Sequence, residues 1–346
     1  MINIAVDAMG GDDAPGVVVR GAVNALESRN GFSITLVGKK ELIEEELSGE
    51  TYLKERLSIA EASEVIEMAE PPVAAIRHKK DSSIVVGLNL VKHNEADAFV
   101  SAGSTGAVLA GGQLIVGKEK GVKRAPLAPL IPTERGAALL IDCGANVDAR
   151  ADHLLQFAYM GSIYMRDICG VEKPRVAIVN IGAEEEKGNA LVKEAYPMLK
   201  EAGEKGDIYF VGSIEARDIP KGEADVVVCE AFVGNVILKL YEGVSSTLLD
   251  VVKTSIMSTA RSKIGGALIK PALKDAMKRF DVSSYGGAPL LGLKNLVVKG
   301  HGSSTEVEIK NAILQCFSFI QKDITSKIRE SISPEGDREG DITNGI

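Results

Sequence analysis

Short apolar runs alternate with segments of helical periodicity along nearly the whole chain, and this alternation constrains the fold more than any other feature. The runs are almost continuous in Val, Ile, Leu and Ala, which is typical of parallel strands buried on both faces. They occupy residues 2–8, 33–38, 97–101, 137–142, 175–180, 207–212 and 225–230. The alternation predicts an α/β fold with three α/β/α layers and a largely parallel sheet. We expect a single domain over residues 1–330 and a flexible acidic tail over residues 331–346.

The charge balance and the cysteines exclude several classes of protein. The 346 residues include 40 basic and 48 acidic side chains, a net charge of −8, which argues against nucleic-acid binding because that requires a basic excess. The 4 cysteines are far apart in the sequence, so we expect reduced thiols in a cytoplasmic protein. The sequence contains no clustered metal ligands and no GxGxxG fingerprint, so we expect neither a metal nor a cofactor.

Residues 98–117 carry no charge and have the length of a membrane span. Five glycines and the polar side chains of Ser101, Ser104, Thr105 and Gln113 interrupt this segment. We therefore expect a strand, a glycine turn and a helix here.

Glycine-rich loops with polar side chains follow most of the predicted strands. They are DAMGGDDAP (7–15), SAGSTGA (101–107), DCGAN (142–146), NIGAEEEKGN (180–189) and CEAFVGN (229–235), and near the end YGGAPLLG (285–292) and KGHGSS (299–304). Ligands of parallel α/β folds bind at the carboxyl ends of the strands. Glycine beside Ser, Thr and Asn exposes backbone N–H groups that cradle anions. These loops therefore predict an anion-binding site.

These motifs, in this order, resemble those of the bacterial acyl-carrier-protein:phosphate acyltransferases, the PlsX family of phospholipid synthesis, over about residues 1–325. The resemblance implies a fold like that of the isocitrate and isopropylmalate dehydrogenases and the phosphotransacetylases. It implies formation of acyl-phosphate from a fatty acyl thioester of acyl carrier protein and inorganic phosphate. The product would feed a membrane-bound glycerol-3-phosphate acyltransferase. It further implies a homodimer associated peripherally with the inner face of the membrane.

Four residues of the motif loops are the predicted catalytic set: Lys187, His301, Asn235 and Glu230. Lys187 offers a cation to phosphate or to the oxyanion, and His301, flanked by glycines, can protonate the leaving thiol. Ser104 stands where the family usually has Asn, and Glu230 precedes Ala231 where the family usually has Asp-Gly.

The remaining predicted site residues hold phosphate or shape the pocket. They are Asp7, Gly10, Gly11, Ser101, Gly103, Ser104, Thr105, Gly106, Asp142, Asn146, Asn180, Glu184, Ser303 and Ser304. Hydroxyl and backbone N–H groups suit the phosphate oxygens, and each polar residue of the set also suits a turn or a helix cap.

A serine hydrolase or thioesterase is the alternative. Ser104 follows a predicted strand and opens a helix, and with Asp225 and His301 it completes the order Ser, Asp, His. A covalent acyl-Ser104 and turnover without phosphate would distinguish this alternative.

Residues 251–280 carry seven basic side chains and one acidic one, a local charge of +6. The helical pattern breaks at Gly265-Gly266, which predicts a helical hairpin over about residues 245–280. Lys270, Lys274 and Lys278 share one face of the second helix, and Leu273 lies roughly opposite. A basic amphipathic helix suits an anionic membrane, an acidic carrier protein or a dimer partner.

Overall fold

The computed structural model describes residues 1–278 and 286–332. The expected acidic tail lies outside the described residues from residue 333 onward. The chain forms two compact units, and each has its own sheet. The described residues of 1–129, 159–173 and 286–332 make up unit 1, and residues 130–158 and 174–278 make up unit 2. The sequence pattern, from which we expect one domain, does not reveal this division. An apolar run shows that a strand is buried, but it does not show which sheet the strand joins.

The sheet of unit 1 has six strands in the order β10-β11-β4-β1-β2-β3, and all neighbours are parallel except β10 and β11. The strands are β1 (Ile2–Asp7), β2 (Phe32–Gly38), β3 (Leu57–Glu61), β4 (Ala98–Ser101), β10 (Ala288–Leu290) and β11 (Leu296–Lys299). Strands β1 and β4 lie side by side, so the loops that follow Asp7 and Ser101 begin next to each other.

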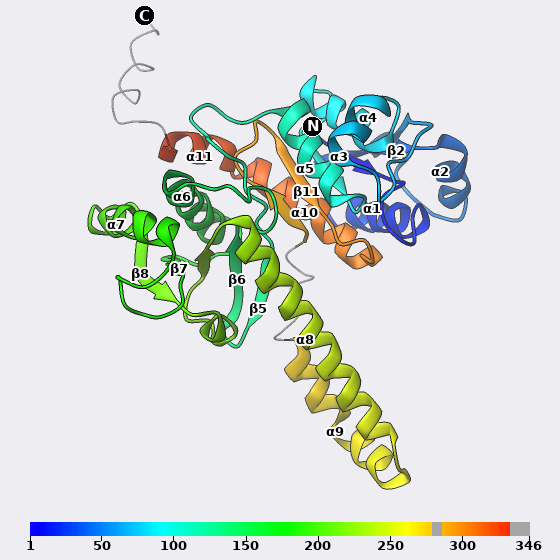
Figure 1. Ribbon diagram of the computed structural model, residues 1–346. Helices are drawn as coiled ribbons and strands as arrows, with labels where there is room; N and C mark the ends of the chain where they lie inside the picture. Colours follow the sequence, from blue (N-terminus) through cyan, green and yellow to red (C-terminus); the bar gives the residue numbers. More distant parts are fainter. Residues whose placement is uncertain (279–285, 333–346) are drawn as a thin grey trace, which may run out of the picture. The chain divides into compact units, whose positions relative to one another are not determined.

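Helices cover both faces of this sheet (Figure 1). On one face lie α1 (Gly16–Ser28) and α10 (Glu306–Gln321), and on the other lie α3 (Pro72–His78), α4 (Ser83–Lys92) and α5 (Thr105–Gly111). Ser82 caps α4 through the N–H of Val85, and a capping box of Thr305 and Glu308 starts α10. Unit 1 also contains α2 (Lys40–Leu47) and α11 (Ile324–Ile332).

The uncharged segment 98–117 forms β4, a turn and α5, as predicted. A π-helical turn over Gly112–Val116 continues α5 and ends at Gly117. No helix in the described parts of the chain is long and apolar enough to cross a membrane.

The sheet of unit 2 has five strands in the order β5-β6-β9-β7-β8, and only β5 is antiparallel to its neighbour. The strands are β5 (Leu130–Thr133), β6 (Gly136–Ile141), β7 (Arg175–Val179), β8 (Tyr209–Ile214) and β9 (Val226–Val228). Helix α7 (Ala190–Glu204) packs on β7 and β8, and α6 (Ala151–Asp167) starts in this unit. The predicted mixed α/β class with largely parallel sheets is confirmed.

A helical hairpin extends from unit 2, formed by α8 (Ala231–Met257) and α9 (Ala260–Lys278), which lie side by side in Figure 1. The predicted break at Gly265-Gly266 is wrong, because α9 continues through both glycines. The turn lies at Ser258–Thr259, where the Thr259 hydroxyl accepts a hydrogen bond from the Ser262 N–H. Gly266 instead allows close packing, because a Cβ there would lie 2.3 Å from Cγ2 of Ile256 on α8.

Candidate active site

The loops after β1 and β4 of unit 1 are joined through a buried carboxylate. The Ser101 hydroxyl donates to Oδ2 of Asp7 at 2.6 Å, and the N–H of Gly103 donates to Ser101 Oγ at 3.0 Å. The N–H of Met9 donates to Oδ1 of Asp7 at 3.1 Å. The predicted residues Asp7, Ser101 and Gly103 therefore form one hydrogen-bonded group at the carboxyl edge of the sheet.

Burial raises the pKa of Asp7, because it removes water from the carboxylate, while the hydrogen bonds from the Ser101 hydroxyl and the Met9 N–H and the positive charge of Lys299 act in the opposite direction. Lys299 is itself buried, and its ammonium donates to the backbone oxygens of Ala102 and Gly300. Sequence reasoning did not assign Lys299. The sequence feature that could have indicated Lys299 is a lysine at the end of an otherwise apolar strand, directly before glycine.

A cavity of about 160 Å³ lies beside this group. Its lining includes the predicted residues Asp7, Gly10, Gly11, Gly103 and Ser104. Ser104 is buried, and its Oγ accepts the N–H of Ala107 as the cap of α5. Thr105 begins α5 and is exposed, and its neighbour Gly106 packs against Pro72. The hydroxyl of Thr105 is therefore open to a ligand, whereas that of Ser104 serves its own helix.

The loop after β11 carries His301, which is exposed. Its Nδ1 lies 2.8 Å from the Ser303 hydroxyl, and the N–H of the buried Ser304 donates to the His301 carbonyl. The Gly302 carbonyl accepts the N–H of Asp12 at 2.8 Å, so this loop is tied to the loop after β1. Within the described part of the chain, no hydrogen bond reaches Nε2 of His301, so that nitrogen can exchange a proton with a ligand.

In unit 2, the loop after β6 is organised by Asp142, which is fully buried. Its Oδ2 accepts the backbone N–H of Asn146 at 2.8 Å and the Asn146 side-chain amide at 2.7 Å, and its Oδ1 accepts the N–H of Ala145 at 3.2 Å. The two predicted residues Asp142 and Asn146 therefore hold the backbone of their own loop.

The loop after β7 presents Lys187 to solvent. The Asn180 amide donates to the Lys187 carbonyl at 3.2 Å and to the Ser213 hydroxyl at 3.1 Å, which fixes the loop backbone. The Lys187 ammonium lies 2.8 Å from Oε1 of Glu184, and both side chains are about half exposed. An exposed ion pair of this kind is weak, so the ammonium can leave Glu184 for a doubly charged anion.

Glu230 and Asn235 occupy the first two turns of α8. The Glu230 carboxylate is the N-cap of this helix and accepts the N–H groups of Phe232 at 2.6 Å and Val233 at 2.9 Å. Asn235 is exposed one turn further along. The geometry thus gives Glu230 a capping role that the motif spacing did not indicate.

The structure does not favour the hydrolase alternative. Asp225 lies directly before β9, at the amino end of the strand, and both of its carboxylate oxygens bind the guanidinium of Arg175 at 2.8 and 3.0 Å. This pairing raises the pKa of Arg175. Asp225 is therefore paired with the permanent positive charge of Arg175 and is not available to orient a histidine.

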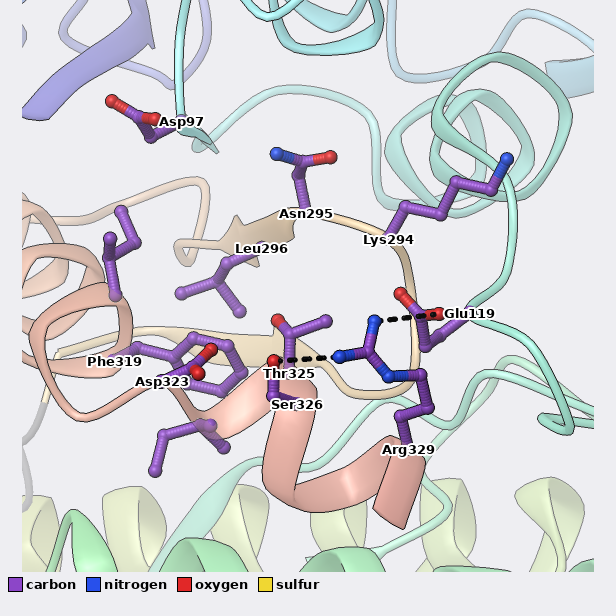
Figure 2. Close-up of a pocket in the computed structure, with 12 residues that line it drawn as sticks. Asp97, Glu119, Lys294, Asn295, Leu296, Phe319, Asp323, Thr325, Ser326 and Arg329 are labelled. Carbon is purple, nitrogen blue, oxygen red and sulfur yellow. Dashed lines mark hydrogen bonds and ion pairs between the residues drawn. The ribbon is translucent and has the colours of Figure 1, made fainter. Parts of the chain in front are cut away.

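A second charged cavity in unit 1, of about 260 Å³, lies at the opposite end of the strands (Figure 2). Asp97 precedes β4 and Asn295 precedes β11, so this cavity is at the amino edge of the sheet. Figure 2 shows Arg329 reaching toward Glu119, at 3.7 Å, and toward the Ser326 hydroxyl, at 3.1 Å. This position separates the cavity from the motif loops at the carboxyl edge.

On the hairpin, Lys270, Lys274 and Leu273 are exposed on α9. The side chain of Lys278 lies outside the described residues. The predicted basic surface is therefore present in the described part of α9.

Comparison with known sequences shows a match over residues 2–327 to the family model described as "Fatty acid synthesis protein". A phosphate acyltransferase of Clostridium botulinum (strain Loch Maree / Type A3) is 49% identical over 329 residues, which is 95% of this chain and 97% of that protein. A phosphate acyltransferase of Alkaliphilus oremlandii (strain OhILAs) is 48% identical, covering 98% of this chain and 99% of that protein.

Two solved structures share the fold at low sequence identity. A phosphotransacetylase from Streptococcus pyogenes has a TM-score of 0.61 and 19% identity, covering 92% of this chain and 94% of that chain. The EutD phosphotransacetylase from Staphylococcus aureus has a TM-score of 0.58 and 16% identity, covering 93% and 94% of the two chains. At these identities the likeness concerns the fold alone.

Proposed function

This chain belongs to the fatty acid synthesis protein family, and we propose that it forms acyl-phosphate from a fatty acyl thioester of acyl carrier protein and inorganic phosphate. The chain is an enzyme that transfers an acyl group with phosphate. The observation that carries this conclusion is the 49% identity to a phosphate acyltransferase over 95% of the chain. The choice of acyl carrier protein as the acyl donor is part of this proposal.

The reaction needs little covalent chemistry from the protein. A phosphate oxygen attacks the thioester carbonyl carbon, the new C–O bond forms, and the C–S bond breaks. The sulfur leaves with the bonding electrons and takes up a proton. Phosphate is already a nucleophile and thiolate is a good leaving group, so positioning and charge stabilisation supply most of the rate.

We assign Lys187 to the negative charge that phosphate brings and that the carbonyl oxygen develops. Its exposed ammonium, on a loop that Asn180 holds, supports this role. In unit 1, the exposed Thr105 hydroxyl can donate to an anion oxygen. The buried group of Asp7 and Ser101 shapes the loop that carries Thr105.

We assign His301 to the proton that the departing sulfur takes up. Its Nδ1 is engaged with Ser303, and its exposed ring leaves Nε2 for exchange. An imidazole ring can accept a proton at one nitrogen and donate it again, and therefore suits this transfer.

An assay with acyl carrier protein carrying a fatty acyl chain, with and without phosphate, tests the proposal. We expect acyl-phosphate, trapped by hydroxylamine, only when phosphate is present. Cleavage of the thioester at the same rate without phosphate would support the hydrolase instead, and no cleavage in either condition would contradict both.

We further propose that the chain works as a homodimer at the inner face of the membrane, where a membrane-bound glycerol-3-phosphate acyltransferase would consume the acyl-phosphate. The exposed Lys270 and Lys274 of α9 support contact with anionic lipid. Changing both to Glu should lower co-sedimentation with anionic vesicles. Changing Lys200 and Lys205, in and after α7, to Glu controls for net charge, and equal binding by both variants would contradict the membrane role.

A further inference from the structure

Unit 2 contains a cavity of a different chemical character from the polar loops described above. It has a volume of about 330 Å³ and is lined almost wholly by apolar side chains. It lies where β7 and β9 end and where α7 and α8 begin, so it occupies the carboxyl edge of the sheet. Two residues of its lining, Asn180 and Glu230, belong to the predicted site.

The polar groups at this cavity are already engaged. Asn180 holds the Lys187 loop, Glu230 caps α8, and Asn189 caps α7 by accepting the N–H of Val192 at 2.9 Å. The surface that remains is hydrocarbon, from residues such as Val192 and Val236. Such a cavity cannot compensate the lost hydration of a phosphate, but it suits an apolar ligand.

Large apolar side chains at the cavity remain in contact with solvent. Ile181 is 78% exposed, Phe232 is 64% exposed and Val236 is 49% exposed. Exposed apolar residues gathered at a concave site are typical of a binding surface. The loop of Lys187 runs directly into Gly188, which lines the same cavity, so a cationic group and an apolar cavity lie close along the chain.

We propose that this cavity binds the hydrocarbon chain of the acyl substrate, an inference that rests on the proposed function. A chain seated there would gain free energy with each buried methylene group. The cavity then determines which chain lengths the enzyme prefers, and Val192 on α7 and Val236 on α8 are specificity-determining residues.

The test uses the full-length protein and acyl carrier proteins loaded with chains of about four to sixteen carbons. Val192→Phe and Val236→Phe each fill part of the cavity from a different helix. We expect kcat/KM for the longest chains to fall about tenfold or more, the effect of excluding about two methylene groups, with the shortest chains unchanged. Val236 is half exposed, so its variant keeps the test valid should Val192→Phe fail to fold.

Val244→Phe is the matched control, because it adds the same bulk to an exposed position of α8 outside the cavity lining. An unchanged chain-length profile in folded Val192→Phe and Val236→Phe would overturn the inference while leaving the proposed function intact. A wild-type protein that forms no acyl-phosphate from any chain would instead overturn the proposed function. Binding of free palmitate, measured by calorimetry, gives an independent readout, which the filling variants should weaken and Val244→Phe should not.

Discussion

Gly234 on α8 lies directly against the backbone carbonyl of Asp142, so that a Cβ at Gly234 would sit 1.9 Å from that oxygen. The first turn of α8 is therefore packed on the loop whose backbone the Asp142 carboxylate organises. Because Gly234 has no side chain, the first turn of α8 can approach the Asp142 loop of the candidate site this closely.

Gly234→Ala should lower the free energy of unfolding by about 3 kcal/mol, because the helix must move away from a backbone atom that cannot yield. Urea denaturation measures this change. Gly243→Ala is the matched control, since nothing lies within 4 Å of a Cβ at that position on the same helix. The control should raise the stability by roughly 0.5–1 kcal/mol, and equal behaviour of the two variants would contradict the packing argument.

Asp7 should make stability depend on pH in a defined direction. Burial raises the pKa of Asp7 in the folded protein above 3.8. The contribution of Asp7 to the free energy of unfolding is therefore fully present below the pKa of the unfolded chain, and it is lost as the pH rises through the pKa of the folded protein. The stability of the wild type relative to Asp7→Asn should therefore decrease as the pH rises above about 4.

Asp81→Asn is the control for this measurement. Hydrogen bonds from Ser63 lower the pKa of Asp81 in the folded protein. The contribution of Asp81 to stability therefore changes only below its ordinary pKa of 3.8 and should be constant as the pH rises above about 4. A constant difference between wild type and Asp7→Asn would show that Asp7 does not titrate as its burial requires.

Asp225→Asn separates structure from catalysis. Removing the charge that binds Arg175 should cost about 1.5–3 kcal/mol of unfolding free energy, because this charge-assisted pair is partly buried and bidentate. Phosphate-dependent turnover should remain within about twofold of wild type, since the residue has no catalytic role in our proposal. Loss of all turnover in a folded variant would restore the hydrolase alternative. Asp218→Asn removes an exposed ion pair with Lys221 and should leave the melting temperature unchanged.

Lys187→Ala should lower kcat on the order of 100-fold, the usual effect of losing one group that stabilises transition-state charge. Its melting temperature should not change, because the ion pair with Glu184 is exposed. Lys200→Ala is a close control, since Lys200 makes the same type of contact with Glu185 at 2.8 Å and is equally exposed. Equal turnover in the two variants would remove Lys187 from the mechanism.

Periodicity predicts β1, β2, β4, β6, β7, β8 and β9 and the loops after them, because burial of parallel strands leaves a clear pattern in the sequence, but it does not predict β3, β5, β10 and β11. Periodicity places Asp7 and Ser101 at the ends of strands, but their contact arises from the pairing of β1 with β4, which periodicity does not predict. The division into two sheets does not follow, because strand pairing depends on contacts between distant segments.

Local hydrogen bonding and packing explain two further differences. Glu230 fits the predicted site by motif, yet its carboxylate bonds to its own helix. Glycine has a low helix propensity, which predicts a break at Gly265-Gly266, but packing against Ile256 outweighs that propensity. The actual turn has a local signal, the Ser258-Thr259 pair, because Thr259 can cap the helix that follows.

Helix α8 runs without interruption for 27 residues from its cap at Glu230. Because each residue of an α-helix adds about 100° of rotation, inserting or deleting one residue would turn the whole distal hairpin about its axis. The direction in which the basic surface of α9 points is therefore fixed by the length of α8. Substitutions along α8 leave that direction unchanged, whereas a change in residue number is tolerated only in steps that complete whole turns, such as seven residues.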